Sequence, residues 1–290
     1  NQDDINAECI RLAKQGLRVV RLKGGDPAIF ARAAEEASAF EKAGIGYEIV
    51  PGITAALASG TCAGIPLTHR EKASAVALIT GHERGGKGES SLDFEALAKF
   101  PGTLVFYMGV TTSRSWTSAL LENGMPHNTP VAIIRKISCP EQVTVKCTLD
   151  EVAHFLDGEN RIRPPAIVII GDVVRDTELN SWFEQRPLFG QRILVTRAAE
   201  QADELVQQLA QLGAEVVLQP AIEILPPETY EALDEVIATV ADVNWIVFSS
   251  GNGVRYFLNR LLALGYDARH LAQAKLAAMG PGTAAALQDF

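Results

Sequence analysis

The segment from Val19 to Arg70 limits what this chain can fold into more than any other, because it twice interrupts a short apolar run with glycine and then continues as a helix. The first run, Leu17 to Leu22, is rich in β-branched residues and ends at Lys23-Gly24-Gly25, where glycine lets the backbone turn sharply. The order of strand, glycine turn and helix predicts an open α/β fold. In such folds, ligands bind at turns beyond the carboxyl ends of the strands.

The helix after this turn has its own start and stop signals. Asp26 is predicted as its N-cap and Pro27 as its first residue, and Gly44 ends it. Its apolar face consists of residues that recur at helical spacing, namely Ile29, Ala33, Ala37 and Phe40.

The second half of the segment repeats this order. Tyr47 to Val50 is predicted as a strand, Pro51-Gly52 breaks it, and Thr54 is predicted to cap the next helix. Nearly all residues of that helix are small: Ala55, Ala56, Ala58, Ser59, Gly60, Ala63 and Gly64. Small residues let either a sheet or a ligand approach the helix backbone closely, and composition does not separate these two interpretations.

Beyond Arg70 the chain changes to a second α/β pattern. Strands are predicted at residues 75–80, 103–108, 131–134, 142–146 and 164–171, with a helix at 149–156. The last strand is wholly apolar, as in a sheet that is covered on both faces. The polar, glycine-rich loop at residues 81–88 is either a lid over a substrate or, the interpretation we favour, a long connection.

A further α/β pattern begins at Gln191, after a short linker at residues 185–190. Strands are predicted at residues 192–197, 214–218 and 244–248, and the last one leads through a Ser-Ser-Gly-Asn-Gly turn into a helix. We therefore predict two α/β parts, residues 1–184 and 191–290.

Charge and composition restrict the function. The formal net charge of −9 argues against a nucleic-acid groove, because phosphate binding requires a concentrated excess of lysine and arginine. No apolar run reaches the ~20 residues of a membrane helix, and the first residues lack signal-peptide features. We expect a cytoplasmic protein that binds neither nucleic acid nor membrane. Scattered cysteines without ligand spacing predict reduced thiols and no metal site: Cys9, Cys62, Cys139 and Cys147.

Several motifs of the first part carry a family resemblance. They are Leu-Lys-Gly-Gly-Asp-Pro at 22–27, Val-Pro-Gly-Ile-Thr at 50–54, Gly-Ile-Pro-Leu-Thr-His-Arg at 64–70 and Thr-Gly-His at 80–82. From Gln2 to about Phe183 the chain resembles the uroporphyrinogen-III C-methyltransferases of the tetrapyrrole methylase family. The resemblance implies a homodimer and a two-lobed tetrapyrrole methylase fold, with lobes at about 1–72 and 73–184 and with the first strand and turn missing.

The second part resembles uroporphyrinogen-III synthase. The motifs are Ile-Leu-Val-Thr-Arg at 193–197, Phe-Ser-Ser-Gly-Asn-Gly-Val at 248–254 and Met-Gly-Pro-Gly-Thr-Ala at 279–284. The two enzymes act on consecutive tetrapyrrole intermediates and occur as natural fusions. The resemblance implies an incomplete Rossmann-like α/β synthase domain, and we expect a fragment that is truncated at both ends. The residues that the family uses in proton transfer are expected upstream of residue 1, so no catalytic residue is assigned.

The resemblance implies S-adenosyl-L-methionine as the methyl donor. Its binding residues would be Gly24, Gly25, Asp26 and Ile29 on one side, Thr54 and Ala55 on another, and Met108 as the far wall. A purely structural N-cap for Asp26 and a buried core position for Met108 both stay open. Ile137 stands where the family commonly has a cofactor-contacting glycine, so we leave it out of the site.

The implied substrate is a polycarboxylate, which an acidic protein binds only through local cations. His69 and Arg70 are candidates, with Arg32 and Arg84 as further ones. Each of them taken alone fits a solvated surface charge better, but His69 and Arg70 stand in the Gly-Ile-Pro-Leu-Thr-His-Arg motif. In the synthase part, the candidates for holding substrate carboxylates are Ser249, Ser250, Asn252 and Thr283. Turn and helix-capping roles fit those four residues as well.

The implied reactions belong to tetrapyrrole synthesis. The first is S-adenosylmethionine-dependent C-methylation of uroporphyrinogen III to precorrin-2, in the branch to siroheme and cobalamin. The second is the closure of hydroxymethylbilane to uroporphyrinogen III by the partial synthase. Two alternatives stay open: another precorrin methyltransferase of the cobalamin pathway, and a non-catalytic module that binds S-adenosylmethionine.

Overall fold

The structure is a computed structural model of the chain, and it describes residues 1–82, 90–159, 161–175 and 181–290. The chain divides into two compact units, Asn1–Pro220 and Ala221–Phe290. The predicted linker at 185–190 lies inside the first unit, where the Leu188 amide donates to the Leu212 carbonyl. Residues 83–88 of the glycine-rich segment predicted as a connection, residues 81–88, lie outside the described residues.

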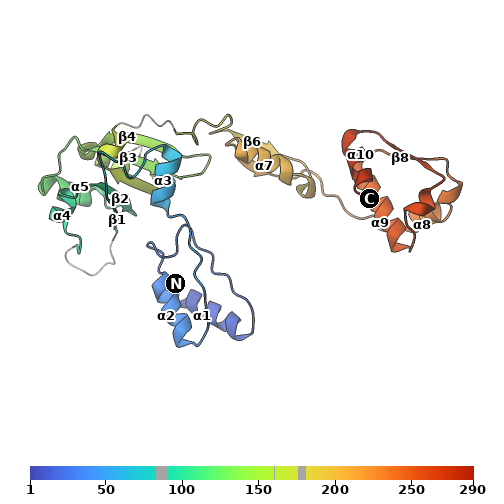
Figure 1. The fold of residues 1–290 in the computed structure, drawn as a ribbon, viewed down its shortest axis with the longest axis horizontal. Coiled ribbons are helices and arrows are strands. Elements are labelled where there is room, and N and C mark those ends of the chain that lie inside the picture. The colour runs from blue at the N-terminus through green and yellow to red at the C-terminus, as the bar shows by residue number, and fades with distance from the viewer. Residues whose placement is uncertain (83–89, 160, 176–180) are drawn as a thin grey trace. The chain divides into compact units, whose positions relative to one another are not determined.

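A five-stranded mixed sheet is the centre of the first unit (Figure 1). Its strands are β1 (Val76–Thr80), β2 (Thr103–Tyr107), β3 (Pro130–Arg135), β4 (Val143–Thr148) and β5 (Ala166–Ile170). Their order is β1-β2-β5-β3-β4, with β1 and β2 parallel and the remaining neighbours antiparallel. All five strands confirm predictions from the sequence.

Helices cover both faces of this sheet. On one face, side chains such as Phe106 and Ile133 form a core with α4 (Phe94–Ala98), α5 (Ser113–Glu122) and α6 (Val152–Asp157). There the ring of Trp116 stacks on Phe106 at a centroid distance of 4.4 Å. The alternate residues, including Tyr107 and Ile169, pack on the other face against α3 (Ala55–Ala63). Burial on both faces explains why β5 is apolar without interruption.

The small residues of α3 serve helix-to-sheet packing. Ala56, Ser59 and Gly60 are buried, and a Cβ atom at Gly60 would lie 2.8 Å from the carbonyl oxygen of Ile65. A side chain at Gly60 would collide with the turn that follows the helix, while Ala56 belongs to the buried cluster on the sheet. The buried face of α3 therefore supports the packing interpretation of its composition.

The N-terminus of α3 is capped by a tyrosine from the sheet. Thr54 is the N-cap residue as predicted, but its side chain makes no capping hydrogen bond. Instead, the Ala56 amide donates to the Tyr107 hydroxyl at 2.8 Å, and the same hydroxyl lies 2.6 Å from Thr54 Oγ1 in a buried hydrogen bond. One phenol thus satisfies two polar groups that α3 would otherwise bury without partners.

The opposite end of α3 is also fixed. The Ser181 hydroxyl donates to the Cys62 carbonyl at 2.6 Å, and the Trp182 indole donates to the Thr61 carbonyl at 3.1 Å. The segment that contains Ser181 and Trp182 therefore lies against the C-terminal turn of α3. The helix is held at both of its ends.

The first lobe contains helices but no strand among its described residues. Besides α3, which packs against the sheet, its helices are α1 (Gln2–Lys14) and α2 (Ala33–Lys42). The predicted strands Leu17–Leu22 and Tyr47–Val50 are wrong, since both runs are extended without pairing to another described segment. Their apolar side chains face solvent: Val20 is 80% exposed and Val50 is 71% exposed. An apolar run becomes a strand only where a neighbouring strand accepts its backbone hydrogen bonds.

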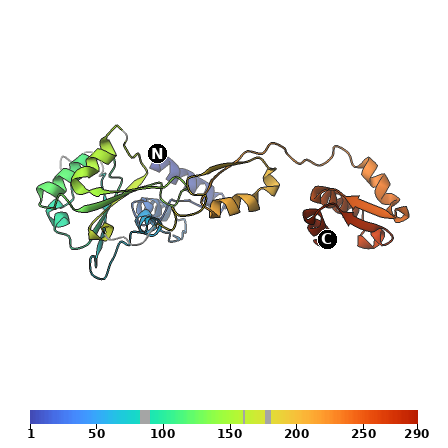
Figure 2. The same ribbon diagram turned by 90° about the horizontal axis from the view of Figure 1, so that it is seen from above.

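The remaining elements are α/β units with two strands each. In the first unit, β6 (Arg192–Val195) pairs in parallel with β7 (Glu215–Leu218), and α7 (Asp203–Gln211) joins them. In the second unit, β8 (Trp245–Phe248) pairs in parallel with β9 (Lys275–Ala278). The helices of that unit, in orange and red in Figure 2, are α8 (Glu231–Ala238), α9 (Gly251–Ala263) and α10 (Pro281–Gln288).

The predicted strands at residues 192–197, 214–218 and 244–248 are confirmed, and β9 is an additional strand. Short 3₁₀ helices complete the elements: η1 (Leu149–Glu151), η2 (Asp172–Val174), η3 (Ala199–Gln201), η4 (Val240–Asp242) and η5 (Ala268–Leu271). Across the described ranges, no helix has the length and apolar character needed to cross a membrane.

We expect Tyr107→Phe to lower the free energy of unfolding of the first unit by about 1–3 kcal/mol, because it leaves the Ala56 amide and the Thr54 hydroxyl buried without their partner. Urea denaturation would measure this loss. The matched control is Tyr47→Phe, since Tyr47 is exposed and its hydroxyl bonds only to the exposed Glu41. That control should change stability by less than about 0.5 kcal/mol. Equal effects of the two variants would show that the cap does not stabilise the fold.

Candidate functional site

Two glycine-bearing bends meet in the first unit. Gly25 has a φ of +82°, which suits glycine, and a Cβ atom built on Gly52 would lie only 2.3 Å from the Gly25 carbonyl oxygen. The Gly52 amide donates to Asp26 Oδ2 at 3.1 Å. The bends predicted from the sequence therefore converge, and only a residue without a side chain fits at the contact.

Asp26 holds the two bends together and does not cap a helix. Its Oδ1 accepts from the Ala28 amide at 2.7 Å, while its Oδ2 accepts from Gly52. The N-cap prediction is wrong, because α2 begins only at Ala33. The intervening residues form turns in which Phe30 and Arg32 have φ values of 51° and 58°, and these left-handed conformations delay the start of the helix.

The N-terminus of α3 lies beside these bends. A Cβ atom on Gly25 would be 3.5 Å from Thr54 Cα and 3.8 Å from the Ala55 nitrogen. Thr54 is buried against Tyr107, whereas Ala55 is partly exposed. The first peptide groups of a helix favour negative charge. Because the Ala56 amide bonds to Tyr107 and the Leu57 amide to the Thr54 carbonyl, the Ala55 amide is the donor of this turn that is available to a ligand.

Met108 follows β2 directly and is displayed by a strained backbone. Its φ is 53° and its side chain is 50% exposed, so the interpretation as a buried core methionine is wrong. The segment after Met108 is joined to the end of β1 by a hydrogen bond, in which Thr112 Oγ1 donates to the Gly81 carbonyl at 2.5 Å. A Cβ atom on Gly81 would lie 2.5 Å from Gly109 Cα, so the ends of β1 and β2 also require glycine.

Tyr107 connects the parts of this candidate site. Its hydroxyl contacts the N-terminal turn of α3, its ring lies 5.0 Å from the ring of Phe30, and Met108 is the next residue. Ile29, Ala55 and Ile137 all pack against the buried cluster that contains Tyr107. The structure thus brings Gly25, Asp26, Ile29, Thr54, Ala55 and Met108 to one region, with Gly24 beside Gly25 on the exposed bend.

Sequence reasoning missed three residues of this region: Phe30, Gly52 and Tyr107. Gly52 had a signal, because it stands in the Pro-Gly break between the second apolar run and α3. Tyr107 and Phe30 had none, since a tyrosine in a strand and a phenylalanine in a turn are common core residues. Ile137, left out of the site, has no positive φ and packs against the same buried cluster as Ile29 and Ala55, although Lys136 and Ser138 on either side of it have left-handed backbones.

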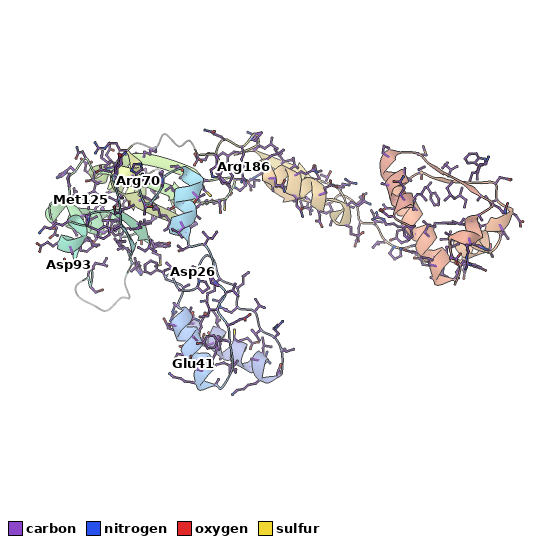
Figure 3. The ribbon with its side chains drawn as sticks, viewed as in Figure 1. Asp26, Glu41, Arg70, Asp93, Met125 and Arg186 are labelled. Carbon is purple, nitrogen blue, oxygen red and sulfur yellow. The ribbon has the colours of Figure 1, made fainter. Side chains whose placement is uncertain are left out.

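The cationic candidates lie on exposed segments. His69 Nδ1 accepts from the Glu71 amide at 3.2 Å, and the His69 backbone pairs with Ala73 in a tight turn. Arg70, labelled in Figure 3, is exposed and forms no ion pair with any of the described residues. Arg32 is exposed and forms an ion pair with Glu35. Arg84 lies outside the described residues.

The candidates of the second unit surround the ends of β8 and β9. Ser250 caps α9, because its Oγ accepts from the Gly253 amide at 3.2 Å. Asn252 Oδ1 accepts from Arg255 Nη2 at 2.6 Å, Ser249 is exposed, and Thr283 is buried in α10. The N-termini of α9 and α10 lie together at the carboxyl ends of parallel strands, where α/β folds bind ligands. Ser250 itself has the capping role that the sequence left open.

Metal ligands do not gather in the described part of the chain, where no group of three or more His, Cys, Asp and Glu side chains comes together. The cysteines are free thiols. The thiol of Cys147 has a strongly raised pKa of about 12, because it is buried and lies near the carboxylates of Glu151 and Asp150. Such a thiol is a poor nucleophile at neutral pH.

Comparison with known proteins places these features in families. Residues 1–153 match the family described as tetrapyrrole (corrin/porphyrin) methylases, and residues 203–290 match uroporphyrinogen-III synthase HemD. The porphyrin biosynthesis protein HemD of Ruminiclostridium josui is 39% identical over 99% of this chain, which spans 57% of that relative's length. Nearly the whole of this chain therefore aligns with little more than half of that relative.

Two further comparisons concern the methylase-like part. The S-adenosyl-L-methionine-dependent uroporphyrinogen III methyltransferase of Methanosarcina barkeri is 46% identical over 60% of this chain and 68% of that protein. The crystal structure of uroporphyrin-III C-methyl transferase from Thermus thermophilus, complexed with S-adenyl homocysteine, aligns with a TM-score of 0.53 at 38% identity. It covers 60% of this chain and 74% of that one. The chain belongs to the tetrapyrrole methylases, and a segment that matches uroporphyrinogen-III synthase HemD follows the methylase part.

Proposed function

We propose that this chain catalyses the S-adenosylmethionine-dependent C-methylation of uroporphyrinogen III to precorrin-2. The observation that carries the proposal is the convergence of the Gly25 and Gly52 bends beside the N-terminus of α3 and the exposed Met108. The names of the relatives support it, since they include an S-adenosyl-L-methionine-dependent uroporphyrinogen III methyltransferase. A synthase portion, converting hydroxymethylbilane to uroporphyrinogen III, is the second part of the proposal.

The residues of the site fit the methyl donor. The bend at Gly24-Gly25 exposes backbone without side chains, and a Cβ atom at Gly52 would close the contact between the bends. Asp26 fixes this geometry with a carboxylate that remains partly exposed. When bound, S-adenosylmethionine supplies a methyl group on a sulfonium, so the chain needs no covalent nucleophile of its own.

The residues of this chain would bind and orient the donor. Gly24, Gly25, Asp26 and Ile29 would hold one side of it, and Thr54 and Ala55 would hold another through the first turn of α3. Met108 would form the far wall, because its exposed side chain stands at the end of β2. Holding two reactants in one geometry accounts for a large part of such a rate enhancement.

The substrate would be held by cations near the donor. Uroporphyrinogen III is a polycarboxylate, and a chain with a net charge of −9 repels it except where cations are exposed. Arg70 meets this requirement because no carboxylate among the described residues neutralises it, and His69 lies beside it on the same turn. Arg32 would add a third charge, although Glu35 offsets part of it.

The synthase portion would bind its substrate at the ends of β8 and β9. There Ser249, Ser250, Asn252 and Thr283 would act together with the N-terminal turns of α9 and α10, which favour carboxylates. The buried position of Thr283 makes it a packing residue of this site, while Ser249 is exposed. The proposal also includes a homodimer and a cytoplasmic location, as the family resemblance implies.

Gly52→Ala should weaken S-adenosylhomocysteine binding at least 10-fold and reduce methyl transfer, because the new Cβ would collide with the Gly25 carbonyl and separate the bends. Isothermal titration calorimetry and a methyl-transfer assay with uroporphyrinogen III would measure the two effects. Gly46→Ala is the control, since nothing lies within 4 Å of a Cβ atom there. If the unaltered chain binds the ligand without transferring methyl, the chain is a binding module. If it does not bind, the site assignment is wrong.

Arg70→Gln should raise the KM for uroporphyrinogen III by about 10- to 100-fold, because a charged hydrogen bond contributes about 1.5–3 kcal/mol. The affinity for S-adenosylhomocysteine should stay the same, since no hydrogen bond or ion pair among the described residues joins the Arg70 side chain to either bend. Steady-state kinetics with both substrates varied would separate these quantities. Arg163→Gln, at another exposed arginine, should change neither value. An unchanged KM in Arg70→Gln would remove Arg70 from the proposed substrate site.

A further inference from the structure

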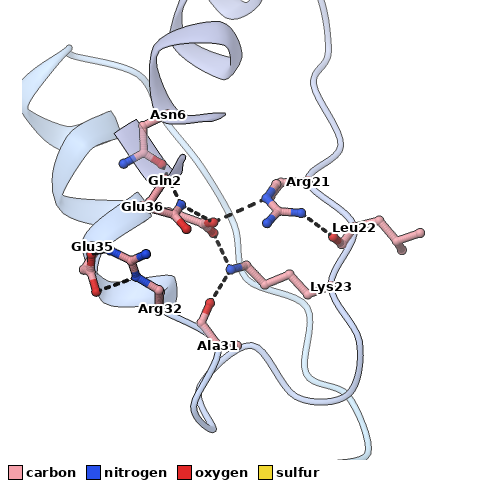
Figure 4. Close-up of polar contacts among 9 residues, drawn as sticks. All are labelled: Gln2, Asn6, Arg21, Leu22, Lys23, Ala31, Arg32, Glu35 and Glu36. Atoms are coloured by element: carbon pink, nitrogen blue, oxygen red, sulfur yellow. Dashed lines mark hydrogen bonds and ion pairs between the residues drawn. The ribbon is translucent and has the colours of Figure 1, made fainter. Parts of the chain in front are cut away.

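A buried carboxylate lies behind the first bend. Glu36, near the start of α2, is only 4% exposed. It accepts a hydrogen bond from Gln2 Nε2 at 2.8 Å and forms ion pairs with Lys23 Nζ at 2.6 Å and Arg21 Nε at 3.3 Å (Figure 4). Burial alone raises the pKa of Glu36, but the hydrogen bonds from Lys23 and Gln2 outweigh it and hold the pKa below the ordinary value.

Lys23 extends this network to the binding bend. Its ammonium group donates to the Ala31 carbonyl as well as to Glu36 (Figure 4). The next residue in the chain is Gly24. Ala31 lies between Phe30 and Arg32, which both have left-handed backbones. One ammonium group therefore fixes the entrance of the Gly24-Gly25 bend and the strained turn that follows it.

No backbone ladder fixes this region. The run before Lys23 pairs with no other described segment, and its apolar side chains are exposed. The polar contacts of Glu36 link that run to the N-terminus of α1 and to α2. A buried ion pair that loses one partner leaves the other charge uncompensated, so the arrangement depends on every member.

We propose that Glu36 is a positioning residue for the donor site. Through Lys23 it sets the position of the Gly24-Gly25 bend and of the turn that carries Asp26, Ile29 and Phe30. This inference rests on the proposed function, since it concerns the same site. It assigns Glu36 no contact with the donor or with the reacting atoms. Its neighbour Glu35 differs, because Glu35 is exposed and pairs with Arg32.

The test is the affinity of the 290-residue chain for S-adenosylhomocysteine, measured by isothermal titration calorimetry beside the thermal unfolding midpoint. Glu36→Gln keeps the shape of the side chain and removes its charge. We expect a loss of affinity of at least 10-fold in protein that is folded at the temperature of the titration. The matched control is Glu8→Gln, which breaks an exposed ion pair with Arg11 in the same lobe and should leave the affinity unchanged.

Variants of Lys23 keep the test decisive if Glu36→Gln does not fold. Lys23→Met should weaken binding more than Arg21→Met, because Lys23 lies closer to Glu36 and also holds Ala31. Lys23→Arg, which keeps the charge, should restore part of the affinity. A purely structural role would lower the unfolding midpoint without changing the affinity of the folded protein.

The outcomes separate the two proposals. If the unaltered chain does not bind S-adenosylhomocysteine, the proposed function fails, and this inference fails with it. If the unaltered chain binds and the Glu36 and Lys23 variants bind equally well, the proposed function stands and Glu36 is not a positioning residue. Weakened binding in both variants, with unchanged binding in Glu8→Gln, supports the inference.

Discussion

The contact between the backbones of Gly25 and Gly52 is the constraint on which the rest of the site depends. A Cβ atom at Gly52 would reach within 2.3 Å of the Gly25 carbonyl oxygen, so the two bends meet only because glycine stands there. Asp26 then fastens them, since its carboxylate accepts the Gly52 amide. Because Gly25 also lies close to Thr54 and Ala55, this one contact sets the first bend against the start of α3.

The site combines two kinds of support. On the side of the sheet, Tyr107 ends a strand that is buried on both faces, and Met108 follows it directly, so their backbone positions follow from a packed core. On the side of the bends, the supports are polar contacts among exposed segments, with Glu36 as the buried exception. The first kind of support is rigid, whereas the second depends on charge.

Much of the fold could be predicted from the sequence, because apolar runs such as Ala166–Ile170 have a neighbour on either side. The runs Leu17–Leu22 and Tyr47–Val50 also contain β-branched residues but have no partner strand, and composition does not contain that information. The meeting of the glycine bends was predictable from the order of motifs. The Tyr107 cap was not, since it joins residues that lie 51 or 53 positions apart in the chain.

Local signals also failed where side chains took unexpected partners. Asp26 and Pro27 are a typical helix start, yet Phe30 and Arg32 adopt left-handed backbones that few non-glycine residues use. The helix therefore begins at Ala33, and the carboxylate of Asp26 is left to bind Gly52. Met108 shows the same limit, because no local pattern indicates that a methionine after a buried strand turns outward.

Helix α3 is anchored at its far end by Ser181 and Trp182, while its near end lies beside the bends. It connects the proposed donor site to the stretch of chain that leads toward the synthase-like segment. A displacement of that stretch would act on the C-terminal turn of α3, where the side chains of Ser181 and Trp182 donate hydrogen bonds to the Cys62 and Thr61 carbonyls. One helix of nine residues thus joins the proposed donor site to this stretch of chain.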